Sequence, residues 1–222
     1  MDKPIKEPID TIATIHIRYK SGDSRLTERV VSVTEFDSVT LFGLCHLRRN
    51  YRTFYFDRIR TCCDVATGEV VTNANGFLKD AYARSSWYSL DRISSTDMPI
   101  LDILLYVAKA DGQMRAPERK VITAAAKAFT HDVRITEEQV KWLLNKLDPV
   151  SLTSFRVEVG KISRLGDSVI NRKLLAAART IISTQKTVSP EEQEALDYLT
   201  RRLANQTHAP KPTDPMGLDS GA

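Results

Sequence analysis

The period of the apolar residues changes once along this chain of 222 residues, and that change constrains the fold more than any other feature. Before residue 72 apolar and polar residues alternate, as at Ile15, Ile17 and Tyr19, which is the pattern of a half-buried strand. After Pro99 apolar residues recur every three or four positions, as at Ile100 and Leu104, which is a helical spacing. The sequence therefore predicts an α+β chain with a small antiparallel β-barrel at residues 12–72 and an all-α bundle at residues 97–204.

The remaining stretches are predicted to be connections. Residues 1–11 are polar and contain proline, and they predict a flexible leader. Residues 73–96 are rich in serine and predict a linker with a short helix in it. Residues 205–222 have no apolar periodicity and contain three prolines, so we expect a disordered tail.

The net charge, the cysteines and the longest apolar stretch indicate the partners and the cellular compartment to expect. The formal net charge of +4 is too small to require a nucleic-acid partner by itself. The cysteines, Cys45, Cys62 and Cys63, form no Cys-x-x-Cys pair and favour reduced thiols. The longest apolar stretch, Ile100–Ala108, is interrupted by Asp102 and is too short to cross a bilayer. We expect a cytoplasmic protein with no membrane span.

The stretch Leu44–Arg60 combines basic and aromatic residues. Its arginines outnumber its single acid, Asp57, and they are interleaved with tyrosine and phenylalanine; they are Arg48, Arg49, Arg52, Arg58 and Arg60. Guanidinium groups match phosphate geometry and aromatic faces stack on bases. The stretch therefore favours single-stranded nucleic acid or a nucleotide-like anionic ligand. The alternative is a strand that buries one face and exposes its arginines to solvent.

Strand alternation selects candidate residues within this stretch. Arg52, Phe54 and Phe56 share one face of a strand, and Tyr51, Thr53 and Tyr55 share the other. Because the two phenylalanines suit a core, we expect Arg52 at the inward-facing rim, where an unpaired buried charge is costly. The predicted anion or nucleic-acid site comprises Arg29, Arg48, Arg52 and Arg58, with Tyr19 and His46 as neighbours.

Residues Ile15–Ile59 resemble a WYL domain, a small Sm-like β-barrel common in bacterial regulators. The matching segments are Ile17–Tyr19, Arg29–Val31, Phe42–Arg48 and Arg52–Ile59. Val39, Thr40 and Leu41 stand where the Trp-Tyr-Leu tripeptide of the family would be. The resemblance implies an Sm-like barrel that binds an anionic ligand through its basic strands.

Residues Ile103–Ile122 resemble the TerB module, an all-helical domain named for tellurite resistance. The family often shows an Ala-Asp-Gly…Glu signature twice, and the first copy here contains Asp111 and Glu118. The second copy ends at Glu192 but has glutamine and lysine in place of Asp-Gly. The resemblance implies a divalent-metal site at Asp111, Glu118 and Glu192. Each of these residues also suits a helix terminus, so we expect weak or no metal binding and no other cofactor.

The sequence contains no catalytic motif, and its four histidines are scattered without ligand spacing, so we predict a protein that is not an enzyme. These observations and the two resemblances leave two candidate functions. The first is a ligand-sensing or nucleic-acid-binding module of a bacterial stress-response or regulatory system. The second is a stress-response scaffold that binds a protein partner through the helical bundle, with the barrel forming a homodimer.

Overall fold

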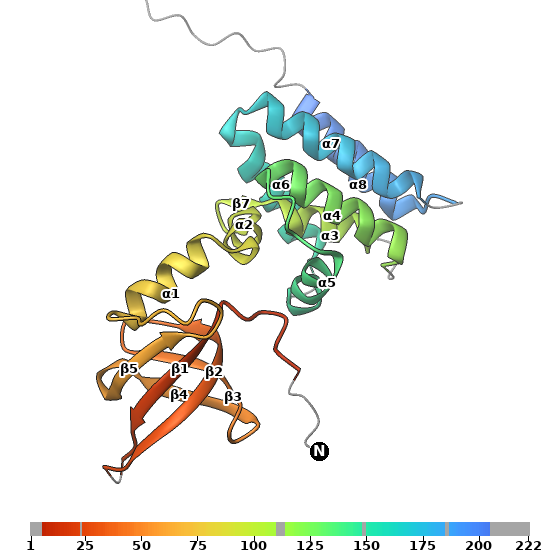
Figure 1. The fold of residues 1–222 in the computed structure, drawn as a ribbon. Helices are drawn as coiled ribbons and strands as arrows, with labels where there is room; N and C mark the ends of the chain where they lie inside the picture. The colour runs from red at the N-terminus through yellow and green to blue at the C-terminus, as the bar shows by residue number, and fades with distance from the viewer. Residues whose placement is uncertain (1–5, 23, 110–113, 148–149, 185–186, 205–222) are drawn as a thin grey trace, which may run out of the picture. The chain divides into compact units, whose positions relative to one another are not determined.

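The computed structural model describes residues 6–22, 24–109, 114–147, 150–184 and 187–204, and Figure 1 shows the chain as a ribbon. It divides into two compact units. The sheet unit comprises Met1–Ile93 and Thr130–Lys146, and the helical unit comprises Ser94–Phe129 and Leu147–Ala222. The α+β class is therefore confirmed: one unit contains the sheet together with several helices, and the other is mainly helical.

Five antiparallel strands form the sheet of the first unit: β1 (Ala13–Lys20), β2 (Leu26–Phe36), β3 (Thr40–Cys45), β4 (Asn50–Tyr55) and β5 (Ile59–Asp64). Their order is β4-β3-β2-β1-β5, so consecutive strands β1 to β4 are neighbours and β5 returns to the other side of β1. A short 3-10 helix, η1 (Phe56–Arg58), precedes β5. Within the described chain β4 and β5 are both edge strands, so strand pairing alone does not close the sheet.

One irregularity bends the sheet between β2 and β3. The register shifts between Val33 and Glu35, where β2 has an extra residue relative to β3. Gly43 lies opposite Val33 at this point, and a Cβ atom on Gly43 would overlap the backbone carbonyl of Ser32. Glycine is therefore required where the bulged strand approaches its neighbour closely.

One face of the sheet carries the core of the unit. Alternate residues of the strands point into it, including Ile15 and Ile17 of β1, which are fully buried, and Phe54 of β4, which is 4 % exposed. The helix α1 (Ala74–Ala83) covers this face with Leu78. Asn73 caps α1, because its Oδ1 accepts a hydrogen bond from the Gly76 N–H at 2.9 Å.

Residues 73–96, expected to be a linker, are mostly helical. The helix α2 (Ser86–Ile93) follows α1 and buries Trp87, Leu90 and Ile93. A third helix, α5 (Glu137–Lys146), also belongs to the sheet unit. Trp87 and Trp142 make an edge contact with ring centroids 5.0 Å apart. The predicted helical bundle at residues 97–204 is therefore interrupted, because residues 130–146 pack on the sheet unit.

An ion pair fixes the start of this returning segment. Asp132 is 8 % exposed and its two carboxylate oxygens accept hydrogen bonds from the Arg134 guanidinium, each at 2.9 Å. The Ser89 hydroxyl of α2 donates to the same carboxylate at 2.8 Å. The Arg134 guanidinium also donates to the Arg84 carbonyl at the end of α1. Asp132 and Arg134 are thus hydrogen-bonded to α2 and to the end of α1, the two helices that follow the sheet.

Residues 6–11, expected to belong to a flexible leader, are bonded to the sheet unit. The Glu7 carboxylate accepts hydrogen bonds from the Thr14 hydroxyl at 2.8 Å and from the Ser32 hydroxyl at 3.2 Å. Asp10 forms an ion pair with Lys146 of α5 at 3.9 Å. This part of the leader therefore has defined partners, while residues 1–5 lie outside the described chain.

The helical unit is built around α3 (Ile100–Ala108), which has seven buried residues and a single acid, Asp102. It packs against α6 (Leu152–Leu165), α7 (Ser168–Ser183) and α8 (Pro190–Ala204). The helix α4 (Ala116–Thr130) belongs to this unit through Phe129, and a two-stranded ribbon of β6 (Ser94–Ser95) and β7 (Met98–Pro99) precedes α3. No helix in the described residues has both the length and the apolar content needed to cross a membrane. The predicted disordered tail, residues 205–222, lies outside the described chain.

Candidate nucleic-acid interface

Three aromatic rings lie on the solvent-facing side of the β3–β4 hairpin. Leu41, Cys45 and Phe54 point into the core, so the residues that alternate with them along each strand point outward. Phe42 and Tyr51 stack with ring centroids 5.5 Å apart and planes 16° apart. We call Phe42, Tyr51 and Tyr55 the aromatic face.

Two of these rings are accessible to a ligand. Tyr51 is 50 % exposed and Tyr55 is 43 % exposed. They are four residues apart on β4, so their Cα atoms lie about 13 Å apart along the strand. Thr53 lies between them and pairs with Phe42 on β3. Each tyrosine side chain is therefore about half exposed, with Phe42 stacked on Tyr51 and Arg58 over the Tyr55 ring.

Positive charge borders the aromatic face. The guanidinium carbon of Arg58, on η1, lies 4.9 Å from the centre of the Tyr55 ring. Such a cation–π contact contributes about 0.5–1 kcal/mol at an exposed site. Arg48 and Arg49 are exposed in the turn that joins β3 to β4. The face therefore has stacking surfaces with cations at both ends of β4.

Acidic side chains lie near the Phe42 end of the aromatic face. Glu35 pairs with Phe42 across the β2–β3 bulge, and a cleft of about 200 Å³ there is lined by Glu35, Asp37 and Phe42 with two neighbours. Asp37 is occupied by the turn, because its carboxylate accepts hydrogen bonds from the Val39 and Thr40 N–H groups, both at 2.6 Å. These hydrogen bonds, that from Thr40 first, lower the pKa of Asp37. Since Thr40 pairs with Tyr55, these acids lie at the same end of the aromatic face as Arg58, and Arg48 and Arg49 lie at the other end.

The six residues of the predicted anion site are divided between the two sides of the sheet. Tyr19, Arg29 and Arg52 lie on the core side, since Arg29 pairs with the inward-facing Ile17 and Arg52 alternates with Phe54. His46 lies on the opposite side, next in sequence to the buried Cys45. Tyr19 and His46 were both expected beside one anion pocket, but they lie on opposite sides of the sheet. The His46 imidazole contacts Ser32, which alternates with the core residues Val31 and Val33.

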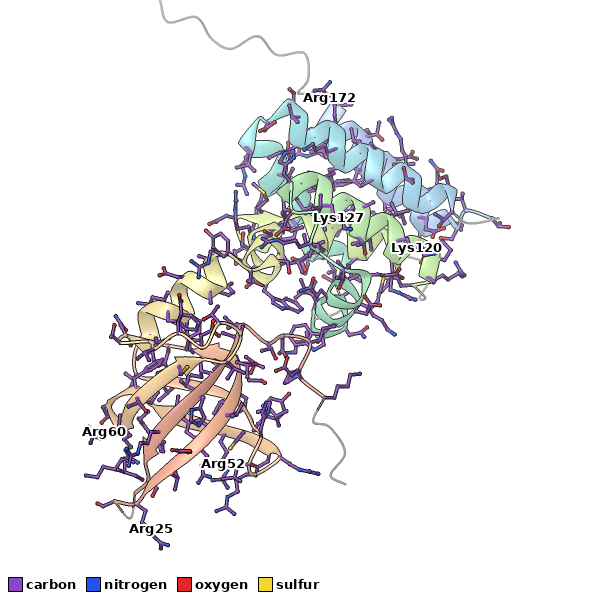
Figure 2. All side chains as sticks on the ribbon, viewed as in Figure 1. Arg25, Arg52, Arg60, Lys120, Lys127 and Arg172 are labelled. Atoms are coloured by element: carbon purple, nitrogen blue, oxygen red, sulfur yellow. The ribbon has the colours of Figure 1, made fainter. Side chains whose placement is uncertain are left out.

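The arginines on the core side do not form one pocket. The strand register separates Arg29 from Arg52 by four residues and two strands, which is about 16 Å along the sheet. Arg52 is exposed, and its Nε donates to the Asn50 Oδ1 at 3.2 Å. Arg52 is therefore not a buried unpaired charge, and it does not need an anion to compensate it. Figure 2 labels Arg52 on the lower part of the sheet.

His46 belongs to a polar network under the leader. The Ser32 Oγ is fully buried and lies 2.8 Å from the His46 Nε2 and 3.2 Å from the Glu7 carboxylate. The residue types match a Ser-His-acid triad, but the carboxylate contacts the serine and not the imidazole, and the serine has no access to a substrate. The network attaches the leader to the outer side of the sheet.

The predicted metal residues have helix-capping partners. Glu118 and Glu192 are fully buried, and their carboxylates accept hydrogen bonds from the Arg115 N–H at 2.6 Å and the Ser189 N–H at 2.8 Å. Both residues are third in the first turn of a helix, which is the capping-box position. Asp111 lies outside the described residues. Within the described chain no group of three His, Cys, Asp or Glu residues is placed to hold a metal ion.

Sequence reasoning named the two tyrosines but not the aromatic face. The sequence places Tyr51 and Tyr55 on one face of a strand but does not reveal Phe42 beside them, because Phe42 lies on a neighbouring strand. No alternation marks the outward position of Phe42 in the apolar stretch Leu41–Leu44, and only the burial of Leu41 and Cys45 shows it.

Comparison of the chain with family models, with curated proteins and with solved structures gives no match. The resemblances to WYL and TerB domains therefore stay predictions.

Proposed function

We propose that the protein is a ligand-sensing or nucleic-acid-binding module that takes single-stranded nucleic acid on its aromatic face. The proposal is carried by one observation: Phe42, Tyr51 and Tyr55 lie together on the solvent side of an antiparallel sheet, with Arg58 over the Tyr55 ring. Sheets that recognise single-stranded RNA stack bases on aromatic residues of neighbouring strands in this way. Each base–aromatic stack contributes about 1–3 kcal/mol.

The strand order supports the more specific proposal of an Sm-like barrel. Four strands follow one another as hairpins, β5 pairs with β1, and η1 lies between β4 and β5. The Tyr19 hydroxyl on β1 accepts a hydrogen bond from the Tyr55 N–H on β4 at 3.3 Å. This hydrogen bond joins β1 to β4 across the core, although the two strands do not pair with each other. A WYL-like domain is consistent with this arrangement.

The setting that we propose is a bacterial stress-response or regulatory system in the cytoplasm. The free thiols Cys45, Cys62 and Cys63 fit a reducing compartment. The helical unit, with its TerB-like first helices, would localise the sheet unit or relay its state to a partner. No step of this role requires catalysis.

The test is fluorescence anisotropy with a short labelled single strand at several salt concentrations. We expect wild type to bind at low salt, and Tyr51→Ala and Tyr55→Ala each to weaken binding by about 1–3 kcal/mol without changing the salt slope. Arg58→Ala is expected to lower the salt slope by about one unit, since it removes one phosphate contact. Tyr88→Ala, an exposed tyrosine of α2, is the matched control and is expected to bind as wild type does.

Two results would overturn the proposal. The first is no binding by wild type at low salt. The second is equal binding by wild type and the Tyr51→Ala/Tyr55→Ala double variant. Either result favours the scaffold function, in which the protein acts through a protein partner or as a homodimer.

A further inference from the structure

Two helices of the helical unit expose basic side chains among small ones. On α4 the outward stripe is Pro117, Lys120, Ala124, Lys127 and Ala128, of which Lys127 is half-buried and the others are exposed. On α7 the exposed residues are Ser168, Val169, Arg172, Ala176, Arg179, Thr180 and Ser183. The cations are seven residues apart on each helix, a spacing of about 10.5 Å. We call Lys120, Lys127, Arg172 and Arg179 the basic face.

The two stripes lie on neighbouring helices. The Lys173 Nζ of α7 donates to the Ala128 carbonyl near the end of α4 at 2.7 Å and lies 5.8 Å from the Phe129 ring centre. These contacts join the two helices at the end of α4. Figure 2 labels Lys120 and Lys127 on α4 and Arg172 on α7. Lys173 therefore has a structural role, because it caps the carbonyl end of α4. The four residues of the basic face have no such role.

Almost no negative charge accompanies these cations. The only acid within α4 is Glu118, which is fully buried and hydrogen-bonded to the Arg115 N–H, and α7 contains none. Asp167 caps the start of α7, where it accepts hydrogen bonds from the Val169 and Ile170 N–H groups. The positive charge of the basic face is thus not balanced by exposed acidic residues within α4 or α7.

Basic residues of the neighbouring helix α6, in contrast, form ion pairs with acidic residues. Its Arg156 pairs with Glu194 at 3.2 Å, and its Lys161 pairs with Glu158 at 3.1 Å. Among the residues that the structure describes, none of the four cations of the basic face has an ion pair. Like charges repel one another without such partners, and an external polyanion would remove that repulsion.

The chemistry of the face selects the polyanion. A helix that binds a membrane surface places tryptophan, phenylalanine or leucine beside its basic residues, and those side chains enter the lipid. The exposed positions between the four cations carry alanine, serine and threonine instead, with Val169 at the start of α7. Small side chains let a rigid backbone approach closely. The basic face offers cations but no exposed aromatic ring on which an unpaired base could stack. It therefore suits the phosphate backbone of a duplex, in which the bases are already paired.

We propose that the basic face binds the phosphate backbone of double-stranded nucleic acid without reading its sequence. This surface is separate from the aromatic face, which stacks on unpaired bases. The chain then has one surface for duplex and one for single strand, and each surface is tested without the other.

The experiment is fluorescence anisotropy of the full-length protein with a blunt-ended duplex of about 20 base pairs, across a salt series. We expect binding whose affinity falls with salt, because each cation displaces counterions with a slope of about 0.9. Lys120→Ala/Lys127→Ala and Arg172→Ala/Arg179→Ala are each expected to lower that slope by about two units. The charge-conserving pair Lys120→Arg/Lys127→Arg is expected to bind as wild type does, which shows that charge and not folding is responsible.

The matched control is Arg201→Ala/Arg202→Ala on α8, which removes the same net charge from exposed positions beside the acids of that helix. It is expected to leave duplex binding unchanged, as is Tyr51→Ala/Tyr55→Ala. The proposal is overturned if wild type does not bind duplex at low salt, or if the α8 control loses as much as the α4 and α7 variants. It is also overturned if the same four residues support tight binding to vesicles of anionic lipid but not to duplex.

Discussion

The Tyr19 hydroxyl on β1 accepts a hydrogen bond from the Tyr55 N–H on β4, at 3.3 Å, and so links two strands that do not pair with each other. The Tyr19 ring also makes an edge contact with Phe54, with centroids 5.1 Å apart and planes at 90°. Tyr19 is 9 % exposed, so its side chain spans the core from one strand to the edge of the sheet. The same β4 residue that it holds, Tyr55, presents its own ring on the aromatic face.

Tyr19→Phe is expected to lower the free energy of unfolding by about 1 kcal/mol. The substitution keeps the ring contact with Phe54 and removes only the hydrogen-bond acceptor for the Tyr55 N–H. Urea unfolding followed by circular dichroism measures the change. Tyr51→Phe, whose hydroxyl lies on an exposed ring, serves as control and is expected to be neutral. An unchanged midpoint for Tyr19→Phe would show that the hydroxyl contact does not hold β4.

The stability of the sheet unit is expected to fall in acid through Asp132. The Arg134 side chain, with help from the Ser89 hydroxyl, lowers the pKa of Asp132 well below its usual range. A carboxyl whose folded pKa is depressed stabilises the fold fully above its unfolded pKa, about 3.9, and loses that stabilisation as the pH falls toward the folded pKa. Unfolding free energy measured from pH 6 to pH 2 should therefore decline below about pH 4.

Asp132→Asn tests the source of this decline. The variant is expected to lose about 1–3 kcal/mol at pH 7, since it leaves Arg134 and Ser89 donors with a weaker acceptor. It should also show a shallower decline in acid than wild type. Asp80→Asn, an exposed residue of α1, removes the same charge and is expected to leave both quantities unchanged. Identical acid profiles for wild type and Asp132→Asn would contradict the prediction.

Trp142→Ala is expected to destabilise the sheet unit by about 2 kcal/mol, less than a fully buried tryptophan would, because Trp142 is only half-buried. Lys146 also loses its contact, since its Nζ lies 3.7 Å from the Trp142 ring centre. Trp87 then loses the ring that covers it, so its fluorescence should shift to longer wavelength in the folded variant. An unshifted Trp87 emission would mean that α5 does not pack on α2.

The thiols are expected to differ in reactivity. Burial, reinforced by Cys63 and Asp64, raises the pKa of Cys62 to about 11, and Cys45 is fully buried. A thiol reacts as the thiolate, so at pH 8 a disulfide reagent should modify Cys63 first and leave the other two until the protein unfolds. Cys63→Ser is expected to abolish the fast phase. A fast phase that persists in Cys63→Ser would show that the core beside β5 opens readily.

Local patterns in the sequence predicted the elements better than their partners. Alternation predicts the strand at β1 and the two faces of β4. Thr136 and Gln139 form a capping box, with reciprocal hydrogen bonds of 3.0 and 3.2 Å. β5 has no clear sequence signal, because Cys62 and Cys63 interrupt its alternation and a register shift falls opposite it. The return of residues 130–146 to the sheet unit depends on contacts such as Trp87 with Trp142, which no local pattern reveals.

The candidate site shows the same limit. Composition selects Leu44–Arg60 as a candidate binding stretch, but charge alone does not say which side of a strand a residue faces. His46 and Tyr19 were grouped although buried Cys45 fixes His46 on the other side. Arg52 was expected at a buried rim, yet the edge position of β4 leaves it exposed. The alternation of Phe54 with Tyr51 and Tyr55 is visible in the sequence, whereas the position of Phe42 beside Tyr51 depends on strand pairing.

The most direct test of base stacking on the aromatic face is a double-mutant cycle between protein and oligonucleotide. Binding of a single strand is compared with binding of an abasic strand of the same length and charge, for wild type and for Tyr51→Ala/Tyr55→Ala. The account predicts that the abasic strand binds wild type more weakly by about 1–3 kcal/mol per stacked base, and that the double variant no longer distinguishes the two strands. Equal affinity of wild type for the normal and abasic strands would contradict it.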